Sequence, residues 1–241
     1  MLSINLDAYR RIVFFIGAGM SAESGVTTYR GAGGIWNQYR YQDFACQRAF
    51  ERDPAKVLDF HELRRQTVAA CQPHAGHQHL AVLQAALPGR VMVVTQNIDG
   101  LLQRAGIKVL AELHGSLWRL RCPLHGTWPD ADAPHYASRH CPACGPGQPA
   151  RPDITWFEDR VDEAVFDLAN KLAEQADLFV AVGCSGVVQP AANVIRRARE
   201  SGAYMVEINP EVTDASHWFQ QQCSEPASRA LPLLFKLPVV P

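Results

Sequence analysis

The 241-residue sequence contains no apolar run near the ~18 residues that a membrane-spanning helix needs, and its first residues lack the apolar core of a signal peptide. Lysine and arginine form no block and the net charge is −1, which argues against nonspecific binding to nucleic acid or membranes. Seven cysteines, an odd number in a chain this long, do not form the pattern of a secreted disulfide framework. We therefore expect a cytoplasmic globular protein with no nucleic-acid or membrane partner, either a monomer or a weak oligomer.

One stretch near the N-terminus organises the chain. Residues 12–16 are apolar and have the composition of a buried strand. The next six residues, GAGMSA at 17–22, fit the G-x-G-x-x-G/A pattern of a dinucleotide-binding turn. Gly17 permits the tight turn, Gly19 lets the backbone approach a pyrophosphate, and Ala22 lets the following helix pack closely. Taken alone, the motif also fits a glycine-rich turn that binds nothing.

The sequence after this turn departs from an ordinary Rossmann unit. Such a unit continues into a helix of about a dozen residues and a second strand with an acidic residue ~20 positions on. Here Gly25 ends the helix almost at once, and residues 27–34 have the composition of a long flexible loop. We expect this loop to close over a cofactor, with Arg30 as a charged contact. The missing acidic residue disfavours a hydride-transferring dehydrogenase.

Strands and helices alternate along the rest of the chain. The pattern predicts strands at 91–95, 109–113, 178–182 and 204–208, the last clear strand. It predicts helices at 53–71, 75–87, 162–176 and 190–201, the first of them with Asp53 as N-cap and Pro54 at its first position. Two core faces follow from helical spacing: Val57, Phe60, Leu63, Arg64 and Val68 in the first helix, and Val165, Leu168, Leu172 and Ala176 in the third.

The alternation predicts an α/β fold: a Rossmann-like parallel sheet with helices on both faces, plus a small lobe made of two inserts. We expect the sheet domain to comprise residues 1–34, 76–115 and 153–241. A helical insert at 35–75 and an insert at 116–152 would form the small lobe. The cleft between the two lobes is the default place for a ligand.

Polar residues follow two of the predicted strands. Gln96, Asn97 and Asp99 come directly after the strand at 91–95, and His114 ends the strand at 109–113. Open α/β sheets place ligand contacts at such strand ends. Each residue also has an ordinary structural interpretation, with Asp99 as a helix cap and His114 as a packing residue.

A cysteine and histidine cluster lies in the second insert. Cys122 and His125 are followed, after fifteen residues, by Cys141 and Cys144. Two such ligand pairs at this spacing indicate a structural zinc site, and three cysteines with one histidine are an accepted tetrahedral set. His135 and His140 are alternative fourth ligands, and a small module without metal is the remaining alternative.

Several of these segments together resemble the sirtuin family. GAGMSAESGVTTYR at 17–30 is similar to the sirtuin pattern G-A-G-x-S-x-E-S-G-[IV]-x-x-[FY]-R, and TQNIDGL at 95–101 to T-Q-N-I-D-x-L. Three further segments resemble sirtuin motifs: the His-Gly pair at 114–115, RPDITWFE at 151–158 and GCS at 183–185. The second resembles R-P-x-[IV]-[VT]-x-F-G-E, with Glu158 in place of glycine and Asp159 in place of glutamate, and the third resembles G-T-S, with Cys184 in place of threonine. Sirtuins are NAD-dependent protein lysine deacylases, so the resemblance implies NAD, Zn²⁺ and acylated lysine as cofactors and substrate. The chain is most similar to the class III-like bacterial deacetylase and desuccinylase subgroup.

The resemblance also implies roles for individual residues. His114 would be the general base, and Asn97 and Asp99 would line the nicotinamide pocket. The substrate would meet Trp156, Phe157, Glu158 and Val187, while zinc would be structural. The residues expected to contact NAD are Gly17, Ala18, Gly19, Ala22, Glu23, Tyr29, Arg30, Gln96, Asn97, Ile98, Asp99, His114, Gly183, Cys184, Ser185, Asn209 and Ala227.

Acyl-chain preference depends on the helix of the first insert. In relatives that prefer acidic acyl chains, a Tyr-x-x-Arg pair binds the distal carboxylate, and here His61 and Arg64 occupy these positions. The guanidinium of Arg64 suits a carboxylate, and one helix turn separates the two residues, so we expect both in one pocket. We expect desuccinylation or demalonylation beside deacetylation, with a pH dependence that His61 would introduce. A solvated Arg64 is the structural alternative.

Three other functions fit parts of this pattern. An NAD-cleaving hydrolase or a protein ADP-ribosyltransferase would use the same scaffold and cofactor with a different acceptor. A dehydrogenase is disfavoured for the reason given above. A non-catalytic binding protein is disfavoured because His114, Asn97 and Asp99 are all present.

Overall fold

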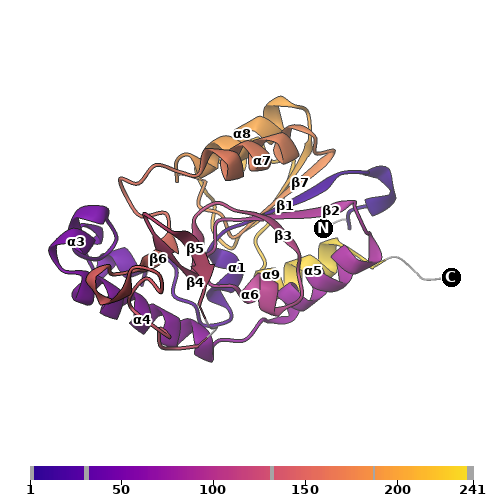
Figure 1. Cartoon of the computed structure of the whole chain (residues 1–241). Coiled ribbons are helices and arrows are strands. Elements are labelled where there is room, and N and C mark those ends of the chain that lie inside the picture. Colours follow the sequence, from indigo (N-terminus) through magenta and orange to yellow (C-terminus); the bar gives the residue numbers. More distant parts are fainter. Residues whose placement is uncertain (1–2, 30–32, 131–132, 187, 238–241) are drawn as a thin grey trace.

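A six-stranded parallel sheet forms the centre of the larger lobe. The computed structural model describes residues 3–29, 33–130, 133–186 and 188–237 (Figure 1). The strand order is β3-β2-β1-β7-β8-β9, and every neighbouring pair is parallel. The parallel α/β fold predicted from the sequence is therefore confirmed. The strands are β1 (Ile12–Ile16), β2 (Val91–Thr95), β3 (Val109–Glu112), β7 (Leu178–Val182), β8 (Tyr204–Ile208) and β9 (Gln221–Cys223).

Helices cover both faces of this sheet (Figure 1). One face packs against α5 (Ala75–Ala86) and α9 (Ala227–Leu234), and the other against α7 (Glu163–Glu174) and α8 (Ala191–Glu200). All five residues of β1 and of β7 are buried, as expected for central strands of a parallel sheet. None of the helices within the described residues is long and apolar enough to cross a bilayer.

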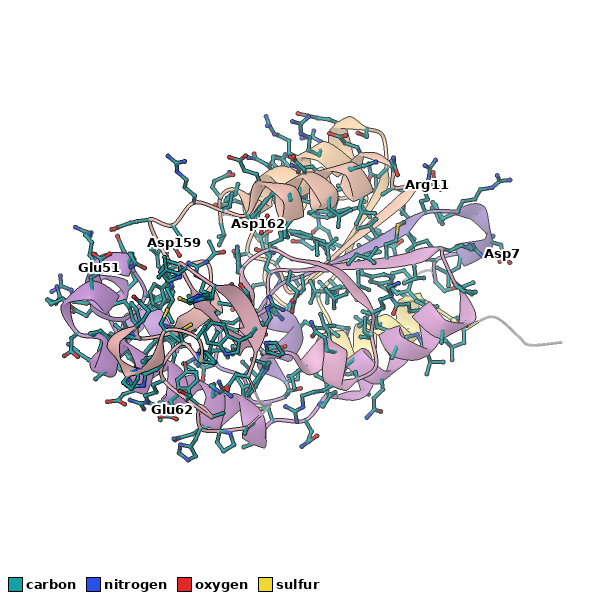
Figure 2. The ribbon with its side chains drawn as sticks, viewed as in Figure 1. Asp7, Arg11, Glu51, Glu62, Asp159 and Asp162 are labelled. Atoms are coloured by element: carbon teal, nitrogen blue, oxygen red, sulfur yellow. The ribbon has the colours of Figure 1, made fainter. Side chains whose placement is uncertain are left out.

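The smaller lobe combines two segments that are far apart in the sequence. Its helices are α2 (Tyr41–Phe44), α3 (Gln47–Arg52) and α4 (Pro54–Ala70), and its antiparallel sheet has the order β5-β4-β6. These strands are β4 (Gly115–Cys122), β5 (Gly126–Pro129) and β6 (Arg151–Ile154). Figure 2 labels Glu51, Glu62 and Asp159 in this lobe, with Asp7 and Arg11 at the far end of the larger one.

Helix α4 begins where the sequence predicts. The backbone N–H of Lys56 donates to Asp53 at 3.0 Å, which confirms Asp53 as the N-cap of α4 with Pro54 as its first residue. The remaining helices are Leu6–Ala8, α1 (Gly19–Ala22), Ile35–Asn37, α6 (Leu101–Arg104), Gly145–Gly147 and Ser216–Trp218.

The structure corrects two predicted core faces. Helix α7 buries Phe166, Ala169 and Ala173, whereas Leu168 is 40% exposed. Val165 and Leu172 are only partly buried against the sheet, because Phe166 and two alanines form the centre of the buried face. In α4, Leu63 is 49% exposed although it keeps helical spacing with the core residues.

Four strands were not predicted. Strand β9 adds to the sheet beyond β8, the last clear strand that the sequence predicts, and β4, β5 and β6 lie around or within the second insert. Strand β9 is only three residues long, and its sequence, QQC, has no β-branched or aromatic residue. Pairing with β8, rather than local propensity, therefore makes β9 a strand.

The order of the strands places a ligand site between β1 and β7. The chain leaves β1 toward the face of α5 and leaves β7 toward the face of α8, so the connection direction reverses at this pair. Ligands of open α/β sheets bind at such a switch point, beyond the carboxyl ends of the strands. Here Gly183, which follows β7, has a φ of 61° and lies against Gly19.

We expect Gly183→Ala to lower the free energy of unfolding by about 3 kcal/mol, because it combines left-handed backbone strain with a steric clash. A Cβ at this position would lie 2.6 Å from the Cα of Gly19. Gly202→Ala is the matched control: its φ is 85°, but a Cβ there would meet nothing within 4 Å, so about 1 kcal/mol is expected. Urea unfolding of both variants measures the difference, and equal losses would contradict the close packing at Gly183.

Candidate active site and metal centre

Backbone contacts bring the turn after β1 against the turn after β7. The N–H of Gly17 donates to the carbonyl of Val182 at 2.9 Å, and the N–H of Gly19 donates to the carbonyl of Gly183 at 3.0 Å. A Cβ on Gly17 would lie 2.5 Å from the Gly183 carbonyl oxygen. The turn is therefore a cradle without side chains, which fits the approach of a pyrophosphate to the backbone.

Further residues expected to contact NAD surround this cradle. Asn209 donates from Nδ2 to the carbonyl of Cys184 at 2.8 Å, and Gln96 Nε2 lies 3.5 Å from the Cys184 sulfur. The carboxylate of Glu23 accepts hydrogen bonds from the backbone and the hydroxyl of Ser228, next to Ala227. Segments that follow β1, β2, β7 and β8 thus meet at one edge of the sheet, where α9 also begins.

Three predicted cofactor residues and one predicted substrate residue are either exposed or outside the described residues. Ala22 is exposed at the end of the four-residue α1, so it does not provide the close helix packing that we predicted. Ser185 is also exposed. Arg30 and Val187 lie outside the described residues.

A cavity connects this edge of the sheet with the small lobe. Asn97 donates from Nδ2 to the Ser21 hydroxyl at 3.3 Å, and the carboxylate of Asp99 accepts from the N–H of Leu101 at 2.9 Å. Burial raises the pKa of Asp99, while hydrogen bonds from Leu101 and Ser21 oppose that shift. The cavity is lined by Ala18, Val26, Thr27, Tyr29, Arg64, Val68, Asn97, Ile98, Asp99 and Leu117.

Ser21 was missing from the predicted site. It is 1% exposed and contacts two polar residues of the cavity, Asn97 and Asp99. The sequence contained a signal for it, because Ser21 is a fixed serine in the sirtuin pattern quoted above. Trp118, which donates from Nε1 to the Asp99 carbonyl at 2.7 Å, carried no such signal.

His114 is oriented by the strand end that follows β2. Its Nδ1 lies 3.0 Å from the carbonyl oxygen of Gln96, so the neutral ring carries its proton on Nδ1 and leaves Nε2 as the acceptor. Burial lowers the pKa of His114 below its ordinary value of 6.5. A neutral imidazole with an open Nε2 is the form that a general base requires.

The structure separates the two residues expected in the acyl pocket. Arg64 lines the cavity, where its Nη2 donates to the Thr27 carbonyl at 3.4 Å and its guanidinium lies 5.6 Å from the centre of the Tyr29 ring. His61 is not among the lining residues: its Nε2 accepts a hydrogen bond from Trp156 Nε1 at 3.0 Å. The expectation of one shared pocket is therefore not met.

His61 also lacks the titration that we predicted for it. It is 4% exposed, and burial lowers its pKa to about 3. The ring stays neutral between pH 6 and 8, so it cannot make the binding of an acidic acyl chain pH-dependent in that range.

The segment expected to contact the substrate packs against the helical insert. The guanidinium of Arg151 lies 3.5 Å from the centre of the Trp156 ring. Phe157 pairs with Cys46 in a parallel bridge. Glu158, where the family pattern has glycine, has a φ of 71°, and its carboxylate accepts two hydrogen bonds from Arg48, at 2.6 and 3.1 Å.

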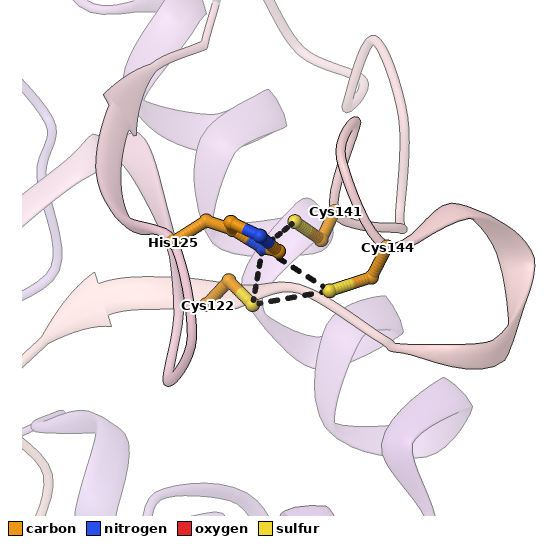
Figure 3. A group of neighbouring side chains, drawn as sticks. All are labelled: Cys122, His125, Cys141 and Cys144. Atoms are coloured by element: carbon orange, nitrogen blue, oxygen red, sulfur yellow. Dashed lines mark hydrogen bonds between the residues drawn. The ribbon is translucent and has the colours of Figure 1, made fainter.

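The predicted metal ligands form one cluster (Figure 3). The ligand atoms of Cys122, His125, Cys141 and Cys144 all lie within 4.8 Å of one another. Three thiolates and one imidazole suit tetrahedral zinc, and with no position open the site is structural. The cluster therefore fits the predicted zinc, with His125 in the position of the fourth ligand. His135 instead pairs with Glu62 at 3.3 Å.

We expect one zinc ion per chain, and less than a tenth of that in Cys141→Ser, because the serine hydroxyl is a poor ligand for zinc. Elemental analysis of purified protein by mass spectrometry measures the ratio. Cys46→Ser is the control, since Cys46 is a free, buried cysteine outside the cluster. Equal zinc content in both variants would contradict the assignment.

Comparison with known proteins agrees with this geometry. The profile of the Sir2 family matches residues 17–190. A protein named NAD-dependent protein deacylase 2 from Pyrobaculum aerophilum is 44% identical over 86% of this chain and 82% of its own length. The mitochondrial NAD-dependent protein deacylase sirtuin-5 of Canis lupus familiaris is 37% identical over 92% of this chain and 80% of its own length.

A solved structure shows the same architecture. The crystal structure of a Sir2 homologue in complex with NAD superposes with a TM-score of 0.85 at 33% identity, covering 97% of this chain and 93% of that one. The family profile, the two relatives and this fold agree over most of the chain. The chain therefore belongs to the Sir2 family, the sirtuins.

Proposed function

We propose that this sirtuin removes acidic acyl groups, such as succinyl and malonyl, as well as acetyl groups from lysine side chains of proteins. The chain is an NAD-dependent protein deacylase, in line with the family and with the names of its relatives. NAD supplies the ribose that takes up the acyl group when nicotinamide is released. The acyl preference rests on one side chain, Arg64.

Arg64 has the properties of a side chain that binds a carboxylate. It is 8% exposed and lies in the cavity with Asn97 and Asp99. Its hydrogen bond to Thr27 is long, at 3.4 Å, and none of the ion pairs within 4.0 Å in the described part of the chain includes it. A buried guanidinium gains most from a bidentate carboxylate, which the distal end of a succinyl or malonyl chain would provide.

His114 and the polar residues of the cavity have separate roles in the proposed reaction. We assign His114 as the general base, because its Nδ1 bonds the Gln96 carbonyl, which leaves Nε2 as the acceptor, and its lowered pKa favours the neutral ring at pH 7. Asn97 and Asp99, fixed by Ser21 and by the N–H of Leu101, present polar groups suited to a carboxamide. No cysteine nucleophile is needed: Cys184, which lies next to this site, has its pKa raised to about 12 by burial.

We expect NAD-dependent loss of acetyl and succinyl groups from lysine peptides, and a loss of activity of at least about a hundredfold in His114→Ala. Mass spectrometry of the peptides, with and without NAD, measures both. His217→Ala is the control, because His217 is exposed and distant from the cavity. Release of nicotinamide with no deacylation of any peptide would instead favour an NAD-cleaving hydrolase or an ADP-ribosyltransferase.

The assignment of His114 as the general base also predicts how kcat/KM depends on pH. Since protonated His114 cannot accept a proton, kcat/KM should fall as the pH drops through the lowered pKa of the ring, with a midpoint below 6.5. Initial rates between pH 5 and 8 at subsaturating peptide measure this limb. A midpoint above pH 6.5 would exclude His114 as the group that causes this fall in kcat/KM. The same fall in a His114 variant with residual activity would also exclude it.

For Arg64→Gln we expect KM for a succinyl-lysine peptide to rise at least about tenfold, because a charge-assisted hydrogen bond to the acyl carboxylate is lost. KM for the acetyl-lysine peptide should stay within about twofold. Arg196→Gln, in an exposed pair with Glu200, is the matched control. An equal rise for both peptides, or a change in KM for NAD alone, would show that Arg64 serves the cofactor cavity instead.

A further inference from the structure

One turn of α4 buries three polar side chains that contact three different parts of the molecule. His61, Arg64 and Arg65 are at most 8% exposed. His61 contacts Trp156 of the substrate segment, and Arg64 contacts Thr27 and Tyr29 beside the cofactor. Arg65 faces the second insert. The proposed function uses Arg64 and leaves Arg65 without a role.

Arg65 has the most extensive set of contacts of the three. Its side chain is completely buried, and its Nη1 pairs with the Asp130 carboxylate at 2.5 Å. Its Nε donates to the Ala133 carbonyl at 3.0 Å. The guanidinium also lies 4.5 Å from the centre of the Tyr136 ring and 5.0 Å from that of Trp118. A buried charge held by a carboxylate, a carbonyl and two aromatic faces can occupy only one position.

A second set of contacts holds the outer side of the same turn. Glu62, labelled in Figure 2, accepts a hydrogen bond from the backbone of Tyr136 at 2.9 Å and pairs with Arg139. Arg139 also pairs with Asp59 of α4 at 2.7 Å. Asp130, Tyr136 and Arg139 lie in the sequence between the predicted zinc ligands His125 and Cys141, so the contacts with α4 come from the zinc-binding insert.

We propose that Asp130 of the zinc-binding insert is a positioning residue for acyl-chain selection: by holding Arg65, it fixes the turn of α4 that places Arg64 in the acyl pocket. Arg64 and Arg65 are consecutive on a continuous helix, so a rotation or shift that relaxes Arg65 moves the Arg64 guanidinium as well. The contacts of Arg64 are weaker than those of Arg65: a 3.4 Å bond to the Thr27 carbonyl, the side chain of Tyr29 and the nearby charge of Asp99. The inference rests on the proposed binding of acidic acyl groups by Arg64.

The main test is a double-mutant cycle with Asp130→Asn and Arg64→Gln, measured by KM for succinyl-lysine and acetyl-lysine peptides. Asp130→Asn keeps the shape of the side chain and removes its charge. We expect it to raise KM for the succinyl peptide about fivefold, with KM for the acetyl peptide, KM for NAD and kcat within about twofold. In the Arg64→Gln background, Asp130→Asn should change the succinyl KM no further, because the residue acts through Arg64.

The outcomes separate this inference from the proposed function. A wild-type enzyme that deacetylates but does not remove succinyl or malonyl groups would overturn both. Desuccinylation by the wild type, with equal effects of Asp130→Asn on both peptides or with additive effects in the double variant, would overturn the inference alone. A loss of folded protein lowers kcat for both peptides equally and leaves their KM ratio unchanged, so it cannot imitate the expected result.

A second variant covers the case in which Asp130→Asn does not fold. Arg139→Gln removes the outer pairs of the same contact at a side chain that is one-third exposed. It should raise the succinyl KM about twofold without changing the acetyl KM. Arg197→Gln, which breaks a comparable exposed pair with Glu174 between α7 and α8, should change neither. An unchanged KM ratio in folded Arg139→Gln would then count against the inference.

Discussion

The close approach of two backbone turns determines where the functional site can be. Gly17, Gly19 and Gly183 meet with no room for a Cβ between them, at the point where β1 and β7 end side by side. This contact holds the two turns together, with backbone hydrogen bonds from Gly17 and Gly19 to the segment that ends β7. The strand ends that carry Asn97, Asp99 and His114 then surround this edge because their strands are parallel to β1.

The small lobe depends on the larger one and on its own polar contacts. Its apolar cluster includes Ile98 and Leu101, which belong to the segment after β2, so it does not have a core of its own. A lobe built from two distant segments must pay a considerable loop entropy. The buried Arg65–Asp130 pair links the helical insert to the second insert, and the four zinc ligands hold the second insert together. Cofactor cavity, acyl pocket and zinc site are therefore parts of one connected structure.

The sequence predicted what local pattern and strand order determine. Buried strands such as β1 and β7, the Asp53 cap and the spacing of the zinc ligands are local features, and all were found. Features that depend on tertiary contact were not predicted. Leu168 has the right spacing but lies on the exposed side of α7, and β9 forms only because β8 is beside it. The His61 ring lies against Trp156 because its Nε2 accepts a hydrogen bond from the indole N–H.

Three departures from the family pattern show how the fold accommodates substitution. Cys184 replaces threonine and donates from its thiol to the Phe15 carbonyl at 3.3 Å. Glu158 replaces glycine at a position with left-handed backbone, a strain of about 1 kcal/mol that its pairing with Arg48 helps to offset. His61 replaces tyrosine and is fixed by Trp156. The first change lies in the turn expected to contact NAD, whereas the other two lie on the segments expected to contact the substrate. Differences between this enzyme and its relatives should therefore concern which acylated peptide is bound, while the use of NAD is preserved.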